Sequence, residues 1–271
     1  MAASLAGAAI LLTGASSGIG RALALELGRR GATLLLTGRD ATRLAATAHE
    51  VTATGGRAET ACADLAEPGA ARALVETALQ RLGRLDALVN NAGYGLSAFL
   101  EQAPLPELDR LFAVNVRAVV EATQAALPAL RATRGQVVNV GSVVGHRGLP
   151  ALGGYCMTKA ALASFSEALR PEVARDGVHV LQVEPGLTTT DFGLHRVVVG
   201  PHPRHFRSWF AMTPESVARR IARAMERRQR RLVMGLPGKA LIAANALAPW
   251  LVERLLARKV VRDYGAAPSN R

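Results

Sequence analysis

The chain has few cysteines and few aromatic residues. Only two of its 271 residues are cysteines, Cys62 and Cys156, so it offers no disulfide framework, and a reducing, cytoplasmic location is expected. Aromatic residues make up 4% of the chain and hydrophobic residues 49%, which predicts a core of closely packed alanine, leucine and valine. A metal site is not expected, because no acid or cysteine joins the clustered His195, His202 and His205.

Neither a secretion signal nor a membrane span is expected from the sequence. Residues 1–7 contain no basic residue, and the apolar run at 8–12 is too short for a signal peptide or for a helix that crosses a bilayer. No repeat, low-complexity tract or linker divides the chain. A single domain over residues 1–271 is therefore expected.

Positive charge is concentrated in the last quarter of the chain. Residues 1–200 contain 18 Lys and Arg against 17 Asp and Glu, whereas residues 201–271 contain 15 against 4, out of a total net charge of +12. Seven arginines lie between residues 219 and 231, but no aromatic residue is interleaved with them. We therefore expect a solvated helix face there and no nucleic-acid partner.

Short apolar runs alternate with helical stretches rich in alanine, leucine and arginine. This alternation predicts right-handed βαβ units and an α/β fold: a Rossmann-type doubly wound parallel sheet with helices on both faces, followed by a C-terminal helical extension. The runs are almost continuously apolar, as in strands that are buried on both faces. Strands are expected at residues 8–13, 33–37, 57–61, 87–90, 136–140, 178–183 and 231–234, and helices at 18–30, 39–54, 68–82, 106–133 and 154–176.

A glycine-rich turn follows the first predicted strand. Residues 13–20 read Thr-Gly-Ala-Ser-Ser-Gly-Ile-Gly and lead into a predicted helix. Glycines at this place let backbone N–H groups approach a pyrophosphate, and the helix N-terminus favours its negative charge. Because the turn opens the first βαβ unit, it predicts a dinucleotide cofactor.

The end of the second strand favours NADP(H) over NAD(H). An NAD site usually has a carboxylate there, which binds the ribose hydroxyls. Here Thr37 is followed by Gly and then by Arg39, which is expected to bind a 2′-phosphate with the help of Ser16, Thr37 and Arg43. Asp40 comes one residue later and is expected to cap the next helix.

Tyr155 and Lys159 are four residues apart in a predicted helix, so their side chains lie on one face. A phenol titrates near pH 10, and a neighbouring ammonium group lowers its pKa by favouring the phenolate. The pair therefore predicts a tyrosine that acts as a general acid and base. Cys156 points about 100° away on the helix and is expected to be a packing residue.

With these motifs the chain resembles the short-chain dehydrogenase/reductase family in its single-domain form. The resemblance covers residues 7–200 and rests on the order and spacing of several motifs. They are the glycine turn, Asp64 after the third strand, Asn-Asn-Ala-Gly at 90–93, Asn115, Ser142, Tyr155 with Lys159, and Pro185-Gly186 with Thr190.

The resemblance implies a role for each matching residue. Tyr155 would be the acid and base, Lys159 would bind the ribose hydroxyls and lower the pKa of Tyr155, and Ser142 would donate to the substrate oxygen. Asn115 would hold a water of a proton relay, or else mark a helix kink with its side chain on a backbone carbonyl. Asn90 would only join neighbouring strands. The cofactor would be bound by Gly14, Ser16, Ser17, Gly18, Ile19, Gly20, Arg39, Asp64, Leu65, Asn91, Ala92, Gly93, Tyr155, Lys159, Pro185, Gly186, Thr188 and Thr190.

The expected activity is the NADP(H)-dependent interconversion of a carbonyl and a secondary alcohol on a small molecule. The alternative within the family is a 3-oxoacyl-carrier-protein reductase, against which the long extension beyond residue 235 argues. A non-catalytic NADP-binding protein is disfavoured, because all four catalytic residue types are present. The resemblance also implies a homodimer or homotetramer formed through the helices at 106–133 and 154–176.

The substrate pocket is expected between residues 94–98, residues 145–153 and an irregular lid insert at 187–213. Four aromatic residues are concentrated in the insert: Phe192, Phe206, Trp209 and Phe210. In a chain that is otherwise poor in aromatics, they suggest an apolar or bulky substrate, with ordinary lid packing as the alternative.

The extension at 235–262 is basic and amphipathic, and Pro249 is expected to kink or restart its helix. Its apolar stripe packs on the protein itself or on a partner subunit, as most amphipathic helices do, or it lies peripherally on an anionic membrane surface. The expected stripe consists of Leu241, Ile242, Leu247, Trp250, Leu251, Leu255 and Leu256, flanked by Arg254, Arg258, Lys259 and Arg262.

Overall fold

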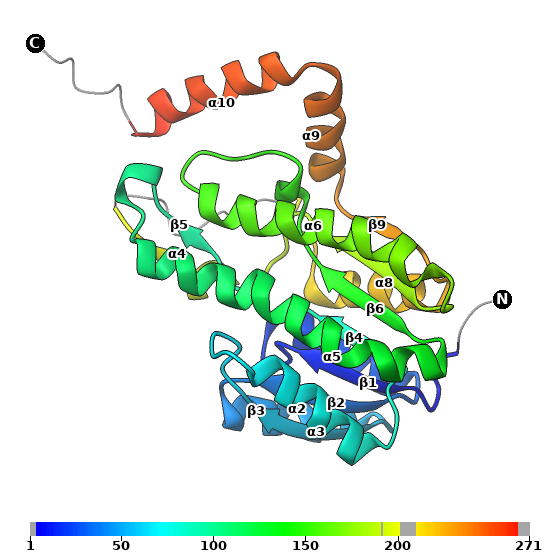
Figure 1. The fold of residues 1–271 in the computed structure, drawn as a ribbon. Coiled ribbons are helices and arrows are strands. Elements are labelled where there is room, and N and C mark those ends of the chain that lie inside the picture. The colour runs from blue at the N-terminus through cyan, green and yellow to red at the C-terminus, as the bar shows by residue number, and fades with distance from the viewer. Residues whose placement is uncertain (1–3, 191, 201–209, 265–271) are drawn as a thin grey trace, which may run out of the picture.

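The computed structural model describes residues 4–190, 192–200 and 210–264, and its centre is a seven-stranded parallel sheet (Figure 1). The strand order is β3-β2-β1-β4-β6-β7-β9. The Rossmann-type sheet predicted from the sequence is confirmed, and each predicted strand lies within one residue of its observed bounds. These are β1 (Ala9–Thr13), β2 (Thr33–Gly38), β3 (Arg57–Cys62), β4 (Ala87–Asn90), β6 (Gln136–Val140), β7 (His179–Glu184) and β9 (Arg231–Val233).

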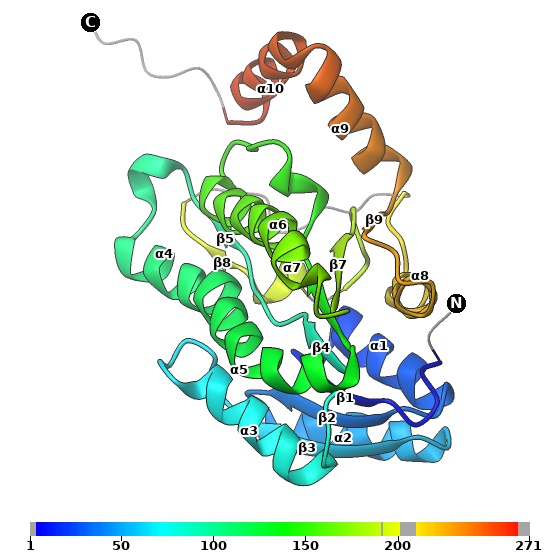
Figure 2. The same ribbon diagram turned by 45° about the vertical axis from the view of Figure 1, so that its right-hand side comes forward.

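Helices cover both faces of the sheet (Figure 2). Successive residues of a strand point to opposite faces, so Ile10 and Leu12 of β1 belong to one core and Leu11 to the other. The first core is closed by α1 (Gly18–Arg29), α2 (Ala41–Ala53) and α8 (Pro214–Glu226), and the second by α3 (Ala70–Leu82), α5 (Ala118–Thr133) and α6 (Gly153–Ala174).

The strand order reverses direction between β1 and β4. From β1 the chain proceeds outward to β2 and β3, and then returns to β4 on the other side of β1. In doubly wound sheets, ligands bind at such a switch point, outside the carboxyl ends of the strands. The glycine turn at residues 13–20 lies at this edge, directly after β1.

The helix predicted at 106–133 is interrupted. It divides into α4 (Leu105–Phe112), a π-helical turn at Ala113–Arg117, and α5. All of the predicted residues are helical, and the departure is confined to the π-helical turn, where Asn115 bonds to Tyr94 and Thr158 outside that turn. Two further short strands, β5 (Leu96–Ser97) and β8 (Val197–Val198), pair with each other and join the segment after β4 to the lid insert.

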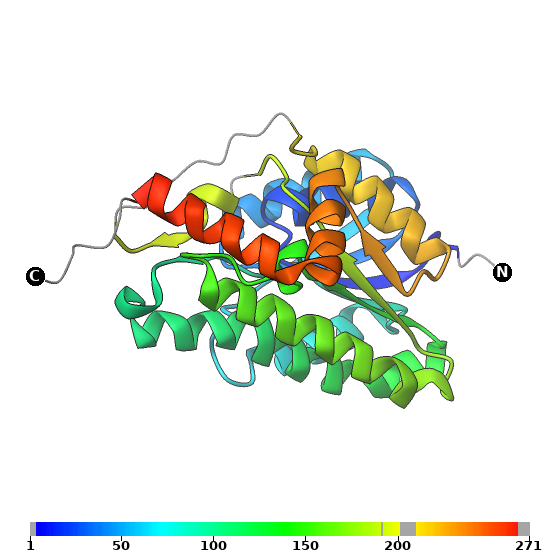
Figure 3. The ribbon, with the colours of Figure 1, turned by 90° about the horizontal axis from the view of Figure 1, so that it is seen from above.

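The C-terminal extension forms two helices at the outer side of the molecule (Figure 3). These are α9 (Leu236–Leu247) and α10 (Pro249–Tyr264), and α10 restarts at Pro249 as expected. A helix with the length and hydropathy to cross a membrane is not found within the described ranges.

Candidate active site

The glycine turn is held tightly against the end of β4. Gly14 has a φ of +68°, and a Cβ added to it would lie 2.7 Å from the Cα of Ala92. A Cβ at Gly20 would lie 1.9 Å from the carbonyl oxygen of Gly14. The Asn91 amide donates to the carbonyl oxygens of Thr13 (2.9 Å) and Gly14 (3.0 Å). Only glycine therefore fits these two positions.

The first turn of α1 has the features of a pyrophosphate site. Ser17 is the N-cap residue, and its side chain makes no capping hydrogen bond. Without such a cap, the first backbone N–H groups of the helix need acceptors from elsewhere, and the helix dipole favours an anion. Thr190 approaches this turn from the far end of the chain, because a Cβ at Gly18 would lie 3.4 Å from its side chain. Ile19, by contrast, packs against the core.

An exposed arginine, Arg39, and an aspartate that caps the next helix, Asp40, follow the end of β2. Asp40 caps α2 by accepting a hydrogen bond from the backbone N–H of Arg43 (3.0 Å), as expected, and also pairs with its guanidinium. Arg39 is exposed. Ser16 lies over the strand end, since its hydroxyl oxygen would be 3.2 Å from a Cβ at Gly38. The Thr37 hydroxyl is buried and has no hydrogen-bond partner among the residues that the structure describes.

Asp64 is at the neighbouring strand end, after β3. Its carboxylate accepts from the N–H of Ala66 (2.9 Å) and from the guanidinium of Arg110 (2.5 Å). Burial opposes ionisation of Asp64, but these two donors and the nearby charge of Arg39 outweigh it and hold its pKa below the ordinary value. Leu65 borders the same small cavity as Ala92, so these two candidate cofactor residues lie near one another.

Lys159 and Tyr155 lie on one face of α6, as predicted. The Lys159 side chain is only 5% exposed, its Nζ donates to the carbonyl oxygen of Val140 (3.1 Å), and it lies 5.7 Å from the centre of the Tyr155 ring. Burial lowers the pKa of Lys159 to about 8. A Cβ at Gly93 would lie 3.6 Å from Lys159 Nζ, so the lysine borders the Asn-Asn-Ala-Gly segment.

Burial raises the pKa of Tyr155. A hydrogen bond with Ser142 lowers this pKa, and a weaker effect of Cys156 raises it. The phenol is therefore strongly held in its protonated form. The lowering of this pKa by Lys159 stays a prediction. Cys156 is buried, which fits the packing role expected for it.

Ser142 and the Pro185-Gly186 segment approach each other at the ends of β6 and β7. The Ser142 hydroxyl lies 3.5 Å from the carbonyl oxygen of Pro185, which also accepts from the N–H of Val143. Gly186 packs closely on the backbone of Met234, and Thr188 forms an isolated bridge with Met212. The segment that carries Thr188 and Thr190 is thereby held over the site.

Asn115 is buried and fully engaged in the π-helical turn. Its amide donates to the carbonyl oxygen of Tyr94 (3.0 Å) and to the Thr158 hydroxyl (3.1 Å), and its oxygen accepts from the N–H of Tyr94 (3.2 Å). These contacts fit the helix-kink role given as the alternative, and the water relay stays a prediction. Asn90 donates to Asn139 of the adjacent strand (2.9 Å), which fits a purely structural role.

The lid insert reaches the candidate catalytic tyrosine. The ring of Phe192, in the short helix α7 (Phe192–His195), lies 5.6 Å from that of Tyr155 at a tilt of 52°. Phe206, Trp209, His202 and His205 lie outside the described residues. A separate apolar cavity of about 230 Å³ borders the first turn of α6, lined by Leu96, Leu108, Leu149 and Met157 among others, but Tyr155 is not part of its wall.

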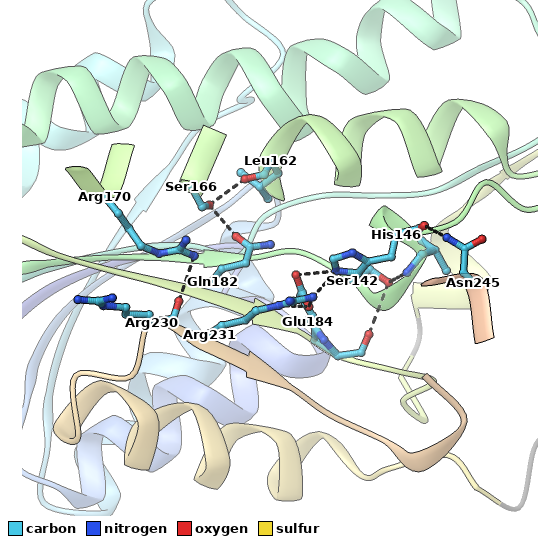
Figure 4. A network of polar contacts seen from close by, with 12 residues as sticks. Ser142, His146, Leu162, Ser166, Arg170, Gln182, Glu184, Arg230, Arg231 and Asn245 are labelled. Atoms are coloured by element: carbon cyan, nitrogen blue, oxygen red, sulfur yellow. Dashed lines mark hydrogen bonds and ion pairs between the residues drawn. The ribbon is translucent and has the colours of Figure 1, made fainter. Parts of the chain in front are cut away.

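A polar network behind Ser142 was not predicted (Figure 4). The buried Glu184, at the end of β7, binds the imidazole of His146 (3.0 Å) and the guanidinium of Arg231 (2.8 Å). Asn245 of α9 donates to the carbonyl oxygen of His146 (3.1 Å) and accepts from Arg147 (3.2 Å). The loop that follows Ser142 is thus fixed to β7, β9 and α9.

Sequence reasoning also missed Arg110 and the hydroxyl of Thr158. The Thr158 hydroxyl accepts from the Asn115 amide and donates to the carbonyl oxygen of Tyr155 (2.8 Å). Its place in the Tyr-x-x-x-Lys segment was the available signal. Nothing in the sequence connects Arg110 with Asp64, which is 46 residues away.

Comparisons with known proteins agree with this geometry. A family model described as short chain dehydrogenase matches residues 8–196. SadH of Mycobacterium tuberculosis, a protein named as an oxidoreductase, is 32% identical over 267 residues, which cover 95% of this chain and 97% of SadH.

The fold is also similar to those of solved protein structures. A short-chain dehydrogenase from Streptomyces avermitilis has a TM-score of 0.79 and 31% identity, covering 95% of this chain and 98% of that one. A short chain dehydrogenase from Burkholderia cenocepacia in complex with NADP has a TM-score of 0.77 and 32% identity, covering 86% of this chain and 98% of that one. The resemblance seen in the motifs is confirmed: the chain belongs to the short-chain dehydrogenase/reductase family and is an oxidoreductase that acts on CH–OH groups.

Proposed function

We propose that the protein is an NADP(H)-dependent oxidoreductase that interconverts a carbonyl and a secondary alcohol, with Tyr155 as general acid and base. The observation that carries the proposal is the convergence of Tyr155, Lys159 and Ser142 beside the glycine turn and Gly93, at the switch point of the sheet. Tyr155 provides a proton, Lys159 a positive charge and Ser142 a hydrogen-bond donor, and the three side chains lie close together.

In the reductive direction, the chemistry that NADPH would supply, when bound by the residues of the glycine turn, is a hydride for the carbonyl carbon. The C=O π electrons move to oxygen, and Tyr155 donates its proton to that oxygen, which yields the alcohol. Ser142 donates a hydrogen bond to the same oxygen as negative charge develops there. Because burial raises the pKa of Tyr155, the phenol starts as a proton donor at neutral pH.

The Tyr155→Phe variant tests this role. We expect the binding of NADPH, followed by its fluorescence, to stay near normal, while turnover of any ketone accepted by the wild type falls by about a thousandfold or more. Ser142→Ala should retain cofactor binding as well, with a smaller loss of turnover. Turnover of Tyr155→Phe close to that of the wild type would overturn the assignment.

The proposed preference for NADP(H) rests on the exposed Arg39 and on the hydrogen bond by which the Asp40 carboxylate caps α2. In Arg39→Ala, the affinity for NADPH should fall about ten- to a hundredfold, since a charge-assisted contact is lost, while the affinity for NADH changes little. Arg57→Ala is the matched control. Arg57 is an exposed arginine at the start of the neighbouring strand β3, at the edge of the sheet opposite to Arg39. An equal loss for both cofactors in Arg39→Ala would contradict the proposal.

We further propose an apolar or bulky substrate. This is supported by the contact of Phe192 with Tyr155 and by the apolar residues that line the nearby cavity, among them Leu96, Ala98 and Leu149. A panel of ketones that increase in apolar size, assayed with NADPH at 340 nm, tests it. A 3-oxoacyl thioester in the same panel tests the alternative, a 3-oxoacyl-carrier-protein reductase. A preference for small polar ketones would contradict the proposed substrate class.

A homodimer or homotetramer through α4, α5 and α6 is also part of the proposal. The exposed Leu105 of α4 and Met157 of α6 support such an interface, because they leave apolar surface on this side. Analytical ultracentrifugation measures the state directly, and a monomer at micromolar concentration would contradict it.

A further inference from the structure

The helix α10 has two unlike faces. Val252, which is 8% exposed, and the half-buried Leu256 and Val260 face the protein. Trp250 is 66% exposed and Leu255 is 54% exposed, and Leu251 and Val261 are exposed with them. The single apolar stripe expected from the sequence is therefore divided, because Leu256 lies on the inner side and most of the other apolar residues lie on the outer side.

Three arginines share the outer face with these apolar residues. Arg254, Arg258 and Arg262 are each four residues apart, and at 100° per residue they lie between Trp250 and Leu255 around the helix. All three are exposed.

The acids of α10 leave this face basic. Glu253 lies on another side of the helix, where its carboxylate is 3.8 Å from Arg147 of the active-site loop. Asp263 binds Lys259 and Arg262 at the far end. Arg254 and Arg258 therefore give the middle of the outer face a positive charge.

We infer that α10 binds peripherally to the surface of a bilayer that contains anionic lipids. A tryptophan, leucines and arginines on one helix face match the headgroup region, where apolar side chains enter the acyl boundary and cations meet phosphates. A protein partner fits less well, since burying Arg254 and Arg258 there requires acids on the partner to pair with them. The inference does not depend on the proposed activity.

The contacts of the extension give this attachment a defined position. Asn245 of α9 binds the backbone of His146, and Glu253 of α10 approaches Arg147, so both helices are anchored to the loop that follows Ser142. In Figures 1 and 2, α10 lies beyond α6 at the periphery of the molecule, where a flat surface can reach it.

A charge comparison with a matched control tests the inference. The full-length protein is sedimented with vesicles of phosphatidylcholine and phosphatidylglycerol, and with vesicles of phosphatidylcholine alone. Removing three arginines in R254Q/R258Q/R262Q should lower partitioning onto the anionic vesicles by roughly a hundredfold. The control R219Q/R220Q/R223Q removes the same charge from the exposed face of α8 and should change partitioning less than about threefold.

An apolar comparison tests insertion. In W250S/L255S, partitioning should fall by about tenfold, whereas L100S, which removes a leucine that is 81% exposed elsewhere, should leave it unchanged. Thermal unfolding and gel filtration check that each variant keeps its fold and oligomeric state.

Three results would overturn the inference. They are no binding of the wild type to anionic vesicles, equal losses in the two arginine variants, and unchanged binding of W250S/L255S. A change of oligomeric state in the α10 variants alone would assign this face to a subunit contact instead.

Discussion

Replacement of Lys159 by methionine should stabilise the fold at neutral pH, although it removes a residue of the proposed site. The Lys159 ammonium is buried with one hydrogen bond, to the carbonyl oxygen of Val140, and no acid pairs with it among the interactions of the described residues. Its pKa is lowered from 10.5 to about 8 by burial. Methionine has a similar length and is uncharged, so it removes this unfavourable burial of charge.

The magnitude follows from the shift in pKa. Below pH 8 lysine is protonated in both the folded and the unfolded chain, and a difference of about 2.5 units in pKa costs the fold about 3 kcal/mol. Loss of the hydrogen bond offsets about 1 kcal/mol, so Lys159→Met should gain about 2 kcal/mol at pH 7. Between pH 8 and 10.5 the folded chain releases this proton first, so the stability of the wild type rises and the advantage of the variant disappears.

The assay is urea unfolding followed by circular dichroism, at pH 7 and pH 10 and at one protein concentration, because an oligomer makes the midpoint concentration-dependent. The difference between the two proteins cancels the other groups that titrate in this range. Lys239→Met, which changes an exposed lysine, is the control and should show no such dependence. If Lys159→Met is less stable than the wild type at pH 7, or if the difference does not change by about 2 kcal/mol on going to pH 10, the reasoning is wrong.

Two further predictions concern the turn and the network. Gly20→Ala should abolish NADPH binding in a fluorescence titration, since its Cβ would overlap the carbonyl oxygen of Gly14. Gly148→Ala is the control and should bind NADPH normally, because a Cβ there meets nothing within 4 Å. Normal binding by Gly20→Ala would contradict the geometry of the turn. Glu184→Gln should lower the free energy of unfolding by about 2 kcal/mol, because Arg231 loses its buried acid, and should lower kcat more than it raises KM, because the loop after Ser142 loosens. Thermal unfolding and steady-state kinetics measure both effects, and Glu215→Gln, an exposed acid of α8, should leave them unchanged.

The sheet could be predicted well because its signal is local. Each strand is a short apolar run that is buried on both faces, as in Leu34 to Leu36 of β2, and such runs stand out between helices. The glycine turn was predictable for a similar reason. Gly14 has a φ of +68°, and a Cβ at Gly20 would overlap the carbonyl oxygen of Gly14, so much of the requirement for glycine arises within the turn itself.

Contacts between distant side chains could not be predicted from the sequence. The pair of Arg110 with Asp64 and the set of His146, Glu184 and Arg231 depend on which strand ends and helices become neighbours in space. Any of the many arginines was an equal candidate for such a partner. The π-helical turn is of the same kind, because Asn115 takes its partners from Tyr94 and Thr158, which belong to other segments.

The structure also explains part of the uneven charge. Arg231 pairs with the buried Glu184, and Arg228 donates to the carbonyl oxygen of Gly135, just before β6. These two arginines therefore fix the start of the strand β9 and the residues before it to the rest of the sheet. The exposed arginines of α8 alternate with an apolar side that packs on α1, as expected for a solvated helix face. On α10, however, arginines and apolar side chains share the same exposed face, which neither solvation nor packing against the described residues accounts for. That difference between two helices with three exposed arginines each is the reason to assign a surface partner to α10 and not to α8.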